Sequence, residues 1–265
     1  MQVVIASASE VVARAARAVA EVLGARPGAV LGLAAGRTME PVYAALARLH
    51  RENGLSLATA RAFLLDEYLE LDRDDPRRLR AEVERALVGP TDLPGDALEA
   101  PDPRAADPAA EAARYEAAVR EAGGVDLQLL GIGANGHLGF NEPGAALLGR
   151  TRVQVLAEAT LAANRTALEA GGGRPPRAAI TQGLGTLLAA RRLVLVATGS
   201  AKAQAVAEAV EGPLAARVPA SVLQLHPDAL LLVDEAAAAG LRDPGSWRHA
   251  ERVARDLDAA GAAGR

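Results

Sequence analysis

Side chains that can bind or move protons are concentrated in one short segment, residues 131–144, with the sequence GIGANGHLGFNEPG. Its most versatile members are Asn135, His137 and Glu142. A histidine titrates near neutral pH and can carry a proton, while a carboxylate can fix its tautomer and orientation. The intervening glycines allow sharp turns and close approach to a ligand. This loop is therefore a candidate site of acid–base chemistry.

A second acid, Asp66, follows a predicted strand at residues 61–65. Ligands of open α/β sheets bind outside the carboxyl ends of the strands, so Asp66 is a candidate base for a carbon next to a carbonyl. The alternative is a solvated acid at the start of a loop. A metal held by Asp66, His137 and Glu142 is a further alternative, but one histidine among hard acids makes a poor zinc site. We therefore expect no metal.

Two segments have the order strand, short glycine loop and helix, which favours anion binding at the helix N-terminus. The first loop spans Gly36, Arg37 and Thr38, and the second runs from Thr198 to Lys202. Lys202 is the single lysine among 29 basic residues, and a compact ammonium suits a phosphate. Neither loop has the pattern of a nucleotide P-loop, so we predict a smaller phosphate ester. An ordinary strand–helix turn remains the alternative.

Gly131, Gly133 and Gly136 also fit the G-x-G-x-x-G pattern of dinucleotide sites. That motif needs a sustained helix after the last glycine, with its N-terminus facing the pyrophosphate. Here Pro143 and Gly144 interrupt any such helix. We therefore expect no nicotinamide and no other cofactor.

Composition restricts the class of protein further. The 265 residues are 50% hydrophobic but only 2% aromatic, so the core must consist mainly of Ala, Val and Leu. The absence of cysteine excludes disulfides and thiolate metal sites. A net charge of -4 argues against nucleic-acid binding, and no apolar run approaches the ~20 residues of a membrane span. We expect a soluble, cytoplasmic protein with no nucleic-acid or membrane partner.

Strands alternate with helices along the chain, which predicts an α/β protein: a three-layer αβα fold with a mostly parallel, Rossmann-like central sheet, in a single domain of residues 1–265. The predicted strands are residues 3–6, 29–34, 61–65, 125–130, 151–156, 178–181, 192–197 and 229–233. The predicted helices are residues 10–23, a segment through 43–49, 82–87, 111–121, a helix containing Arg165, 183–188, a segment ending at 210, and 219–225.

Ser9 is expected to cap the first helix. Residues 89–109 are predicted to form a surface excursion, and residues 171–176 a flexible break. Residues 245–265 are expected to form a C-terminal helical tail that frays from residue 259.

Four blocks, in this order along the chain, resemble the glucosamine-6-phosphate deaminases. They are GLAAGRT at residues 32–38, LDEYL at 65–69, the loop at 131–144, and TGSAK at 198–202. The resemblance continues through residues 223–227 and 233–235, so it covers nearly the whole chain.

The resemblance implies conversion of glucosamine 6-phosphate and water to fructose 6-phosphate and ammonia, an isomerisation coupled to deamination that uses no metal or cofactor. On the family pattern, Asp66 moves the proton between C2 and C1 through an enolamine-like intermediate. His137 assists opening of the pyranose ring, and Glu142 orients His137. Asn135 completes the catalytic set; some family members have aspartate there.

The resemblance also implies that the 6-phosphate is bound by Gly36, Arg37, Thr38, Arg165 and Lys202. Arg37 replaces a serine common in the family, and it could add a charged donor or crowd the site. Allosterically activated members carry a basic residue near the position of Gln154, so the resemblance implies neither that regulation nor the hexamer associated with it. Monomer and homo-oligomer both remain open.

The sequence leaves alternative functions open. A 6-phosphogluconolactonase shares the fold and the G-x-G-x-x-G-H loop, but its sequence after the histidine differs, and it usually has Asp-Glu-Arg where this chain has Asp66-Glu67-Tyr68. A non-catalytic sugar-phosphate sensor is disfavoured by the intact Asp66, His137 and Glu142. The same chemistry on another amino-sugar phosphate is a third possibility.

Overall fold

A seven-stranded sheet forms the centre of the computed structural model, which describes residues 1–156 and 174–263. The strand order is β1-β10-β9-β6-β2-β3-β5, and every neighbouring pair is parallel. The strands are β1 Gln2–Ala6, β2 Val30–Leu33, β3 Arg61–Leu64, β5 Leu98–Glu99, β6 Leu127–Gly131, β9 Arg192–Ala197 and β10 Ala229–Asp234.

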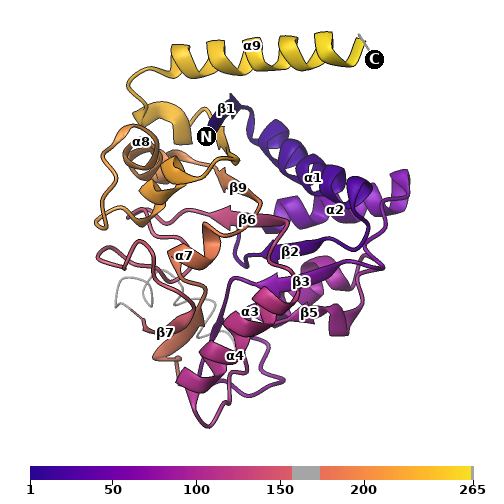
Figure 1. Ribbon diagram of the computed structural model, residues 1–265, viewed down its shortest axis with the longest axis vertical. Coiled ribbons are helices and arrows are strands. Elements are labelled where there is room, and N and C mark those ends of the chain that lie inside the picture. The colour runs from indigo at the N-terminus through magenta and orange to yellow at the C-terminus, as the bar shows by residue number, and fades with distance from the viewer. Residues whose placement is uncertain (157–173, 264–265) are drawn as a thin grey trace.

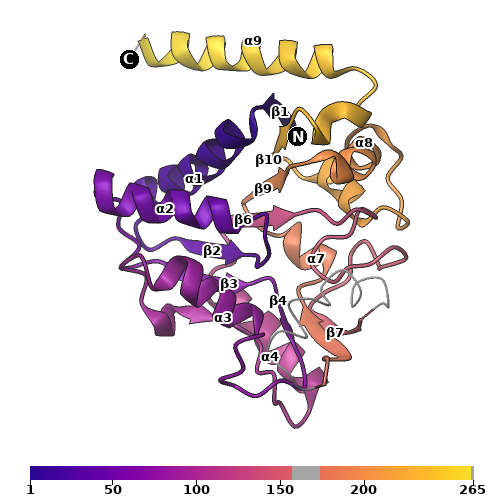
Figure 2. The same ribbon diagram turned by 180° about the vertical axis from the view of Figure 1, so that it is seen from behind.

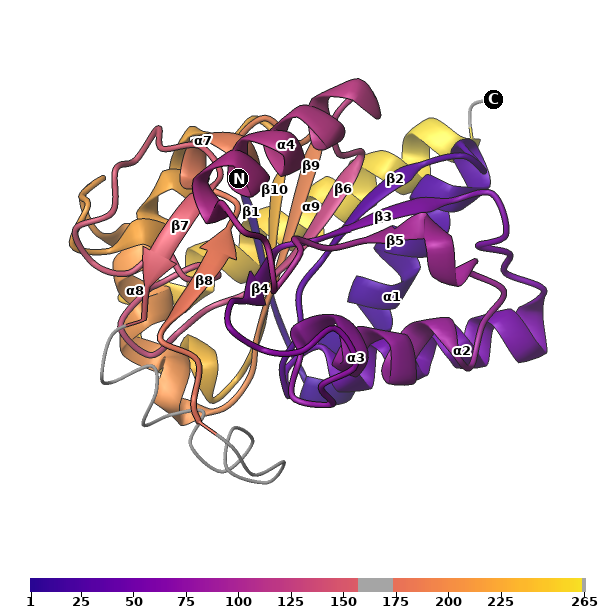
Figure 3. The same cartoon turned by 90° about the horizontal axis from the view of Figure 1, so that it is seen from below.

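Helices cover both faces of this sheet, with α1 and α2 on one face and α4 on the other (Figure 3). The helices are α1 Ala8–Ala25, α2 Glu40–Asn53, α3 Leu79–Val83, α4 Pro108–Glu121, α7 Leu184–Leu187, α8 Ala203–Glu211 and α9 Pro244–Ala263. The predicted three-layer αβα fold with a parallel, Rossmann-like sheet in one domain is confirmed (Figure 1).

The core lies between these layers and consists mainly of Val, Leu and Ala, as composition predicts. Strands of a parallel sheet are buried on both faces, which explains their continuous apolar runs. The few aromatic residues fill gaps; the Phe63 and Tyr115 rings, for example, meet edge to face with centroids 5.8 Å apart. No helix in the described part of the chain is long and apolar enough to cross a bilayer.

A second, smaller sheet was not predicted. It has the order β4-β8-β7, with β4 Asp66–Tyr68, β8 Ala178–Thr181 and β7 Arg152–Val155, all antiparallel. Only Leu65 separates β3 from β4, and it bonds to both sheets. Its N–H donates to Leu33 O at 2.7 Å, and its carbonyl accepts from Gln182 N at 2.9 Å. A three-residue strand is too short to show a period in the sequence.

Several predicted boundaries are corrected by the structure. Ser7, not Ser9, caps α1: its hydroxyl accepts a hydrogen bond from Glu10 N at 3.2 Å. Residues 82–87 do not form one α-helix, because α3 ends at Val83 and a π-helical turn, η1, continues from Glu84 to Val88. The excursion at 89–109 contains the 3-10 turn η2, Gly95–Ala97, and the edge strand β5.

Short 3-10 turns complete the list: η3 Ser200–Lys202, η4 Pro219–Leu225 and η5 Ala237–Gly240. The C-terminal helix α9 is present as predicted, but it continues to Ala263 beyond the residue where fraying was expected. It lies beside α1 at the β1 edge of the sheet (Figure 2), where Arg14 Nη1 donates to Glu251 Oε1 at 2.9 Å.

Candidate active site

The functional segments meet where the order of the central sheet reverses. From β2 the chain proceeds to β3 and β5, whereas from β6 it proceeds in the other direction to β9 and β10. Such a switch point opens a crevice at the carboxyl ends of the strands, where α/β proteins bind ligands. The segments that follow β2, β3, β6 and β9 carry all the predicted site residues except Arg165, which lies outside the described residues together with its predicted helix.

The Asp66 carboxyl group is buried, with 6% of the residue exposed, and it lies against the loop of residues 131–144. Gly139 has φ +56°, and a Cβ there would come 2.9 Å from Asp66 Oδ2. Only glycine therefore lets the two segments approach so closely. This contact brings the predicted base next to the loop that carries His137.

The environment of Asp66 favours its protonated form. Among the described residues, its carboxyl group accepts no hydrogen bond. Burial raises the pKa of Asp66 to about 8, and the negative charges of Glu67 and Glu82 contribute to that rise. A carboxylate with a raised pKa is a stronger base once it is ionised, which suits the removal of a proton from carbon.

His137, Glu142 and Asn135 form one connected group. Asn135 Nδ2 donates to Glu142 Oε2 at 2.8 Å, and Asn135 Oδ1 accepts from His137 N at 3.2 Å. His137 Nδ1 lies 3.5 Å from Glu142 Oε2, close enough for an ion pair when the imidazole is protonated. The ring packs tightly against Gly133, where a Cβ would lie 2.2 Å from His137 Cε1. The structure therefore brings together the three residues that the sequence predicts for acid–base chemistry.

No helix follows β6 in the dinucleotide-like segment, since residues 132–151 form turns and loops. The prediction that this is not a dinucleotide-binding motif agrees with that geometry. No three His, Asp or Glu side chains within residues 1–156 and 174–263 come together as a metal site would require.

Two residues fix this loop, and their anchoring role was not predicted from the sequence. Asn141 is fully buried; its Nδ2 donates to Leu138 O and Gln182 O, and its Oδ1 accepts from Arg152 Nη1 at 2.8 Å. Thr181 Oγ1 accepts a hydrogen bond from Phe140 N at 3.2 Å. Both tie the loop of residues 131–144 to the small sheet that contains Asp66. Sequence alone cannot distinguish such an anchoring amide from a catalytic one.

The first predicted phosphate loop is shaped by a carboxylate. Gly36 has φ +112°, and its N–H donates to Glu82 Oε1 at 2.5 Å, so this amide is already occupied. The amides of Arg37 and Thr38 and the Thr38 hydroxyl have no partner among the described residues. These groups, with the exposed Arg37 guanidinium, are the donors that the loop offers to an anion.

The second loop has a parallel construction. Gly199 has φ +88°, and its N–H donates to both carboxylate oxygens of Asp234 at 3.0 Å. Lys202 is half-buried; burial lowers its pKa, and the nearby positive charge of Arg37 lowers it further. A cavity of about 580 Å³ is lined mainly by α1 and α2 and is also lined by Arg37 and Thr38 from the first loop and by Thr198 from the second. The two loops therefore converge.

Arg37 and Lys202, the Arg37–Lys202 cation pair, are two cations from separate loops, near enough for the charge of Arg37 to lower the pKa of Lys202, and within the described chain neither has an acidic partner. Two like charges held together without a counterion favour binding of a multiply charged anion. A phosphate group suits this donor set.

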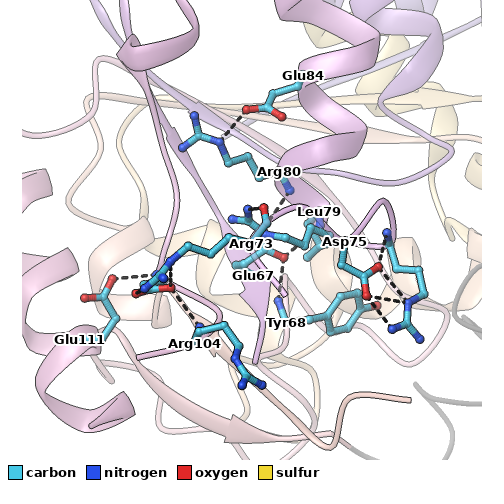
Figure 4. Close-up of polar contacts among 12 residues, drawn as sticks. Glu67, Tyr68, Arg73, Asp75, Leu79, Arg80, Glu84, Arg104 and Glu111 are labelled. Carbon is cyan, nitrogen blue, oxygen red and sulfur yellow. Dashed lines mark hydrogen bonds and ion pairs between the residues drawn. The ribbon is translucent and has the colours of Figure 1, made fainter. Parts of the chain in front are cut away.

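A further acid that was not predicted, Glu67, is fully buried behind Asp66. Its carboxylate accepts hydrogen bonds from the N–H groups of Tyr68, Leu79 and Arg80 at 2.9–3.1 Å, as Figure 4 shows. It also pairs with Arg78 Nε at 3.2 Å. Because Leu79 and Arg80 begin α3, Glu67 fixes the N-terminus of that helix to β4.

Comparison with known proteins agrees with this geometry. Residues 4–232 match the family model described as glucosamine-6-phosphate isomerases/6-phosphogluconolactonase. A glucosamine-6-phosphate deaminase of Streptomyces coelicolor is 47% identical over 234 residues, covering 88% of this chain and 90% of the relative. Another, from Cutibacterium acnes, is 45% identical over 261 residues, covering 98% of this chain and 100% of the relative.

Solved structures show the same fold. A monomeric glucosamine-6-phosphate deaminase superposes with a TM-score of 0.87 at 38% identity, over 91% of this chain and 100% of the other. The 6-phosphogluconolactonase from Trypanosoma cruzi has a TM-score of 0.72 at 20% identity, over 91% of this chain and 97% of the other, and indicates the fold alone. The chain belongs to the glucosamine-6-phosphate isomerase/6-phosphogluconolactonase family.

Proposed function

We propose that this chain is a glucosamine-6-phosphate deaminase, which converts glucosamine 6-phosphate and water to fructose 6-phosphate and ammonia. One observation carries the proposal: the buried Asp66 carboxyl group lies against the loop of His137, in a crevice whose neighbouring loops supply the Arg37–Lys202 cation pair. An amino-sugar phosphate has the complementary groups, an anion at one end and an amine at the other. Relatives with 45–47% identity that bear this name support the choice of substrate.

Substrate binding begins at the phosphate. Arg37, Thr38 and Lys202 hold the 6-phosphate in this proposal, and Arg165 would add a third cation. Gly36 contributes through its backbone conformation, because its own amide is bonded to Glu82. Binding free energy gained at the phosphate, remote from C1 and C2, positions those carbons for proton transfer.

Ring opening is the first chemical step. The imidazole of His137 mediates proton transfer from the anomeric hydroxyl to the ring oxygen as the C1–O5 bond breaks, which gives the open-chain aldehyde. Glu142, 3.5 Å from His137 Nδ1, stabilises the imidazolium that forms transiently. Asn135 holds Glu142 in place through its 2.8 Å hydrogen bond.

Isomerisation follows at Asp66. The carboxylate removes the proton from C2 to give an enolamine and returns a proton to C1, which leaves an iminium group at C2. Water adds to C2, ammonia departs, and fructose 6-phosphate remains. Asp66 must be ionised to act, and the positive charge of the substrate's ammonium group favours that state in a site that otherwise raises its pKa.

The direct test supplies the purified protein with glucosamine 6-phosphate and measures ammonia and fructose 6-phosphate, with galactosamine 6-phosphate and 6-phosphogluconolactone assayed in parallel. We expect equal amounts of both products from glucosamine 6-phosphate and no lactone hydrolysis. Turnover of the lactone alone would assign the lactonase function instead. Binding of the sugar phosphate without turnover would assign a sensor. Because phosphorylated sugars cross lipid bilayers poorly, we also propose a cytoplasmic location.

A further inference from the structure

Glu82, on α3, has no part in the steps above, yet it contacts the loop of residues 36–38 and acts electrostatically on Asp66. Its Oε1 accepts the 2.5 Å hydrogen bond from Gly36 N, and its charge helps to raise the pKa of Asp66 and of Tyr68. We propose that Glu82 is a positioning residue whose carboxylate holds the loop of residues 36–38 in the shape that grips the 6-phosphate. The inference rests on the proposed function and adds a residue to it.

The hydrogen bond from Gly36 explains how one carboxylate can shape the loop. Gly36 has φ +112°, and its carbonyl accepts from Met39 N at 2.8 Å. With both backbone groups of Gly36 engaged, the amides of Arg37 and Thr38 remain for a ligand. A hydrogen bond to an ionised acceptor is about twice as strong as a neutral one, so the Glu82 carboxylate can hold the conformation of this loop.

Glu82 and the predicted phosphate donors have different charged neighbours. The pKa of Glu82 is raised by burial and by the charge of Glu40, and lowered by the Gly36 amide and by Arg85. Lys202, by contrast, has Arg37 as its charged neighbour. Among the described residues, Glu82 forms no ion pair with Arg37 or Lys202.

Glu82 is itself held in place. The N-terminus of α3 is fixed to β4 by the hydrogen bonds of Leu79 and Arg80 to Glu67. Asp66 is the residue next to Glu67. Hydrogen bonds therefore connect the strand that carries the proposed base to α3, and α3 to the loop of residues 36–38. A substrate that spans C2 to the 6-phosphate needs that separation fixed, because misplacement of the reacting atoms is costly.

The charge of Glu82 has a second, measurable effect on the base. Among the described residues, the titratable groups that interact electrostatically with Asp66 are Glu67 and Tyr68 on β4, Glu82 on α3 and Tyr115 on α4. Arg78 pairs with Glu67, and the loop of residues 131–144, which packs against Asp66, carries His137 and Glu142. Removing the charge of Glu82 leaves Glu67 with its partner intact. The pKa of Asp66 should then fall.

The test compares Glu82→Leu, which removes acceptor and charge, with Glu82→Gln, which keeps an oxygen acceptor but loses the charge. Glu84→Leu and Glu84→Gln are matched controls, since Glu84 lies two residues away and pairs with Arg80 at 2.7 Å. Losing a charged hydrogen bond should raise the KM of Glu82→Leu for glucosamine 6-phosphate about tenfold or more with little change in kcat, while Glu82→Gln stays within about threefold. In both Glu82 variants the acidic limb of the pH profile of kcat/KM should move to lower pH, because the pKa of Asp66 falls.

A calorimetric titration with inorganic phosphate separates this inference from the proposed function, because it needs no turnover. We expect weaker phosphate binding in Glu82→Leu and near-normal binding in Glu82→Gln and in the Glu84 controls. Unchanged phosphate affinity and KM in Glu82→Leu would refute the proposal that Glu82 positions the loop of residues 36–38. Tighter binding would refute it too, since Glu82 would then compete with phosphate. If Glu82→Leu does not fold, the pH profile of Glu82→Gln still provides a test. A kcat/KM that falls at the same acidic pH as in the wild type would show that Glu82 does not act on Asp66.

Discussion

Replacing Asp66 with asparagine should abolish turnover and yet stabilise the folded protein at neutral pH. The pKa of Asp66 rises from 3.8 to about 8 on folding, mainly because the group is buried. Between these values the folded protein keeps a proton that the unfolded chain has released. Stability therefore falls as the pH rises through this window, with a slope of about 1.4 kcal/mol for each pH unit.

The size of the effect follows from that slope. From pH 4 to pH 7 the wild type loses up to about 4 kcal/mol of unfolding free energy through this one group. Asparagine has no charge to bury, so Asp66→Asn should match wild type near pH 4 and exceed it at pH 7. For a chain of this size, the difference corresponds to roughly 10 °C in Tm. Loss of the base should lower kcat by about a thousandfold.

Denaturant unfolding of both proteins at pH 4.5, 6 and 7.5 measures the slope directly. Asp126→Asn is the matched control, because Asp126 is also buried but bonds to Arg26, Arg191 and Val30 N at 2.7–2.8 Å. That variant should be less stable by about 2 kcal/mol or more. If Asp66→Asn shows the same pH slope as wild type, or is less stable at pH 7.5, the account of Asp66 as an uncompensated buried acid is wrong.

Three other outcomes can be checked with steady-state kinetics. Lys202→Ala should raise KM for the sugar phosphate about tenfold or more with a smaller change in kcat, because a charged contact to the phosphate is lost; an unchanged KM would exclude Lys202 from the phosphate grip. Glu142→Gln should lower kcat about tenfold or more, because the His137 imidazolium loses its negative partner; wild-type kcat would remove Glu142 from that role. Treatment with EDTA should leave activity intact, whereas a loss that added metal restores would contradict the metal-free mechanism.

The layered fold and the convergence of the site could be predicted because they depend on strong local signals. Alternating strands and helices determine a parallel sheet, and loops after neighbouring parallel strands meet at one edge. Asp66, His137 and Lys202 were therefore identifiable as candidate site residues from their places after strands. The small sheet was not predictable, since β4 has three residues and pairs with β8, a strand more than 100 positions away.

The network of carboxylates behind the site was also hidden from the sequence. Glu67, Glu82 and Asp234 each bind backbone amides of segments distant in the chain, and nothing in their own neighbourhoods distinguishes them from surface acids. Ser9 illustrates a smaller error of the same kind. Ser7 and Ser9 are both good N-cap residues, and only the backbone conformation shows which one ends the extended segment.

The turn of the chain at Leu65 has a consequence for how this enzyme could change. Successive residues of a strand face opposite ways, so the neighbouring acids Asp66 and Glu67 are assigned to different tasks purely by strand parity. One residue inserted between β3 and β4, with the pairing positions of β4 kept, would reverse the face to which each acid points: the glutamate would move to the place of Tyr68, and an aspartate, one methylene shorter, would have to reach the amides of α3. The length of this connection is therefore as strictly constrained as the identity of the base.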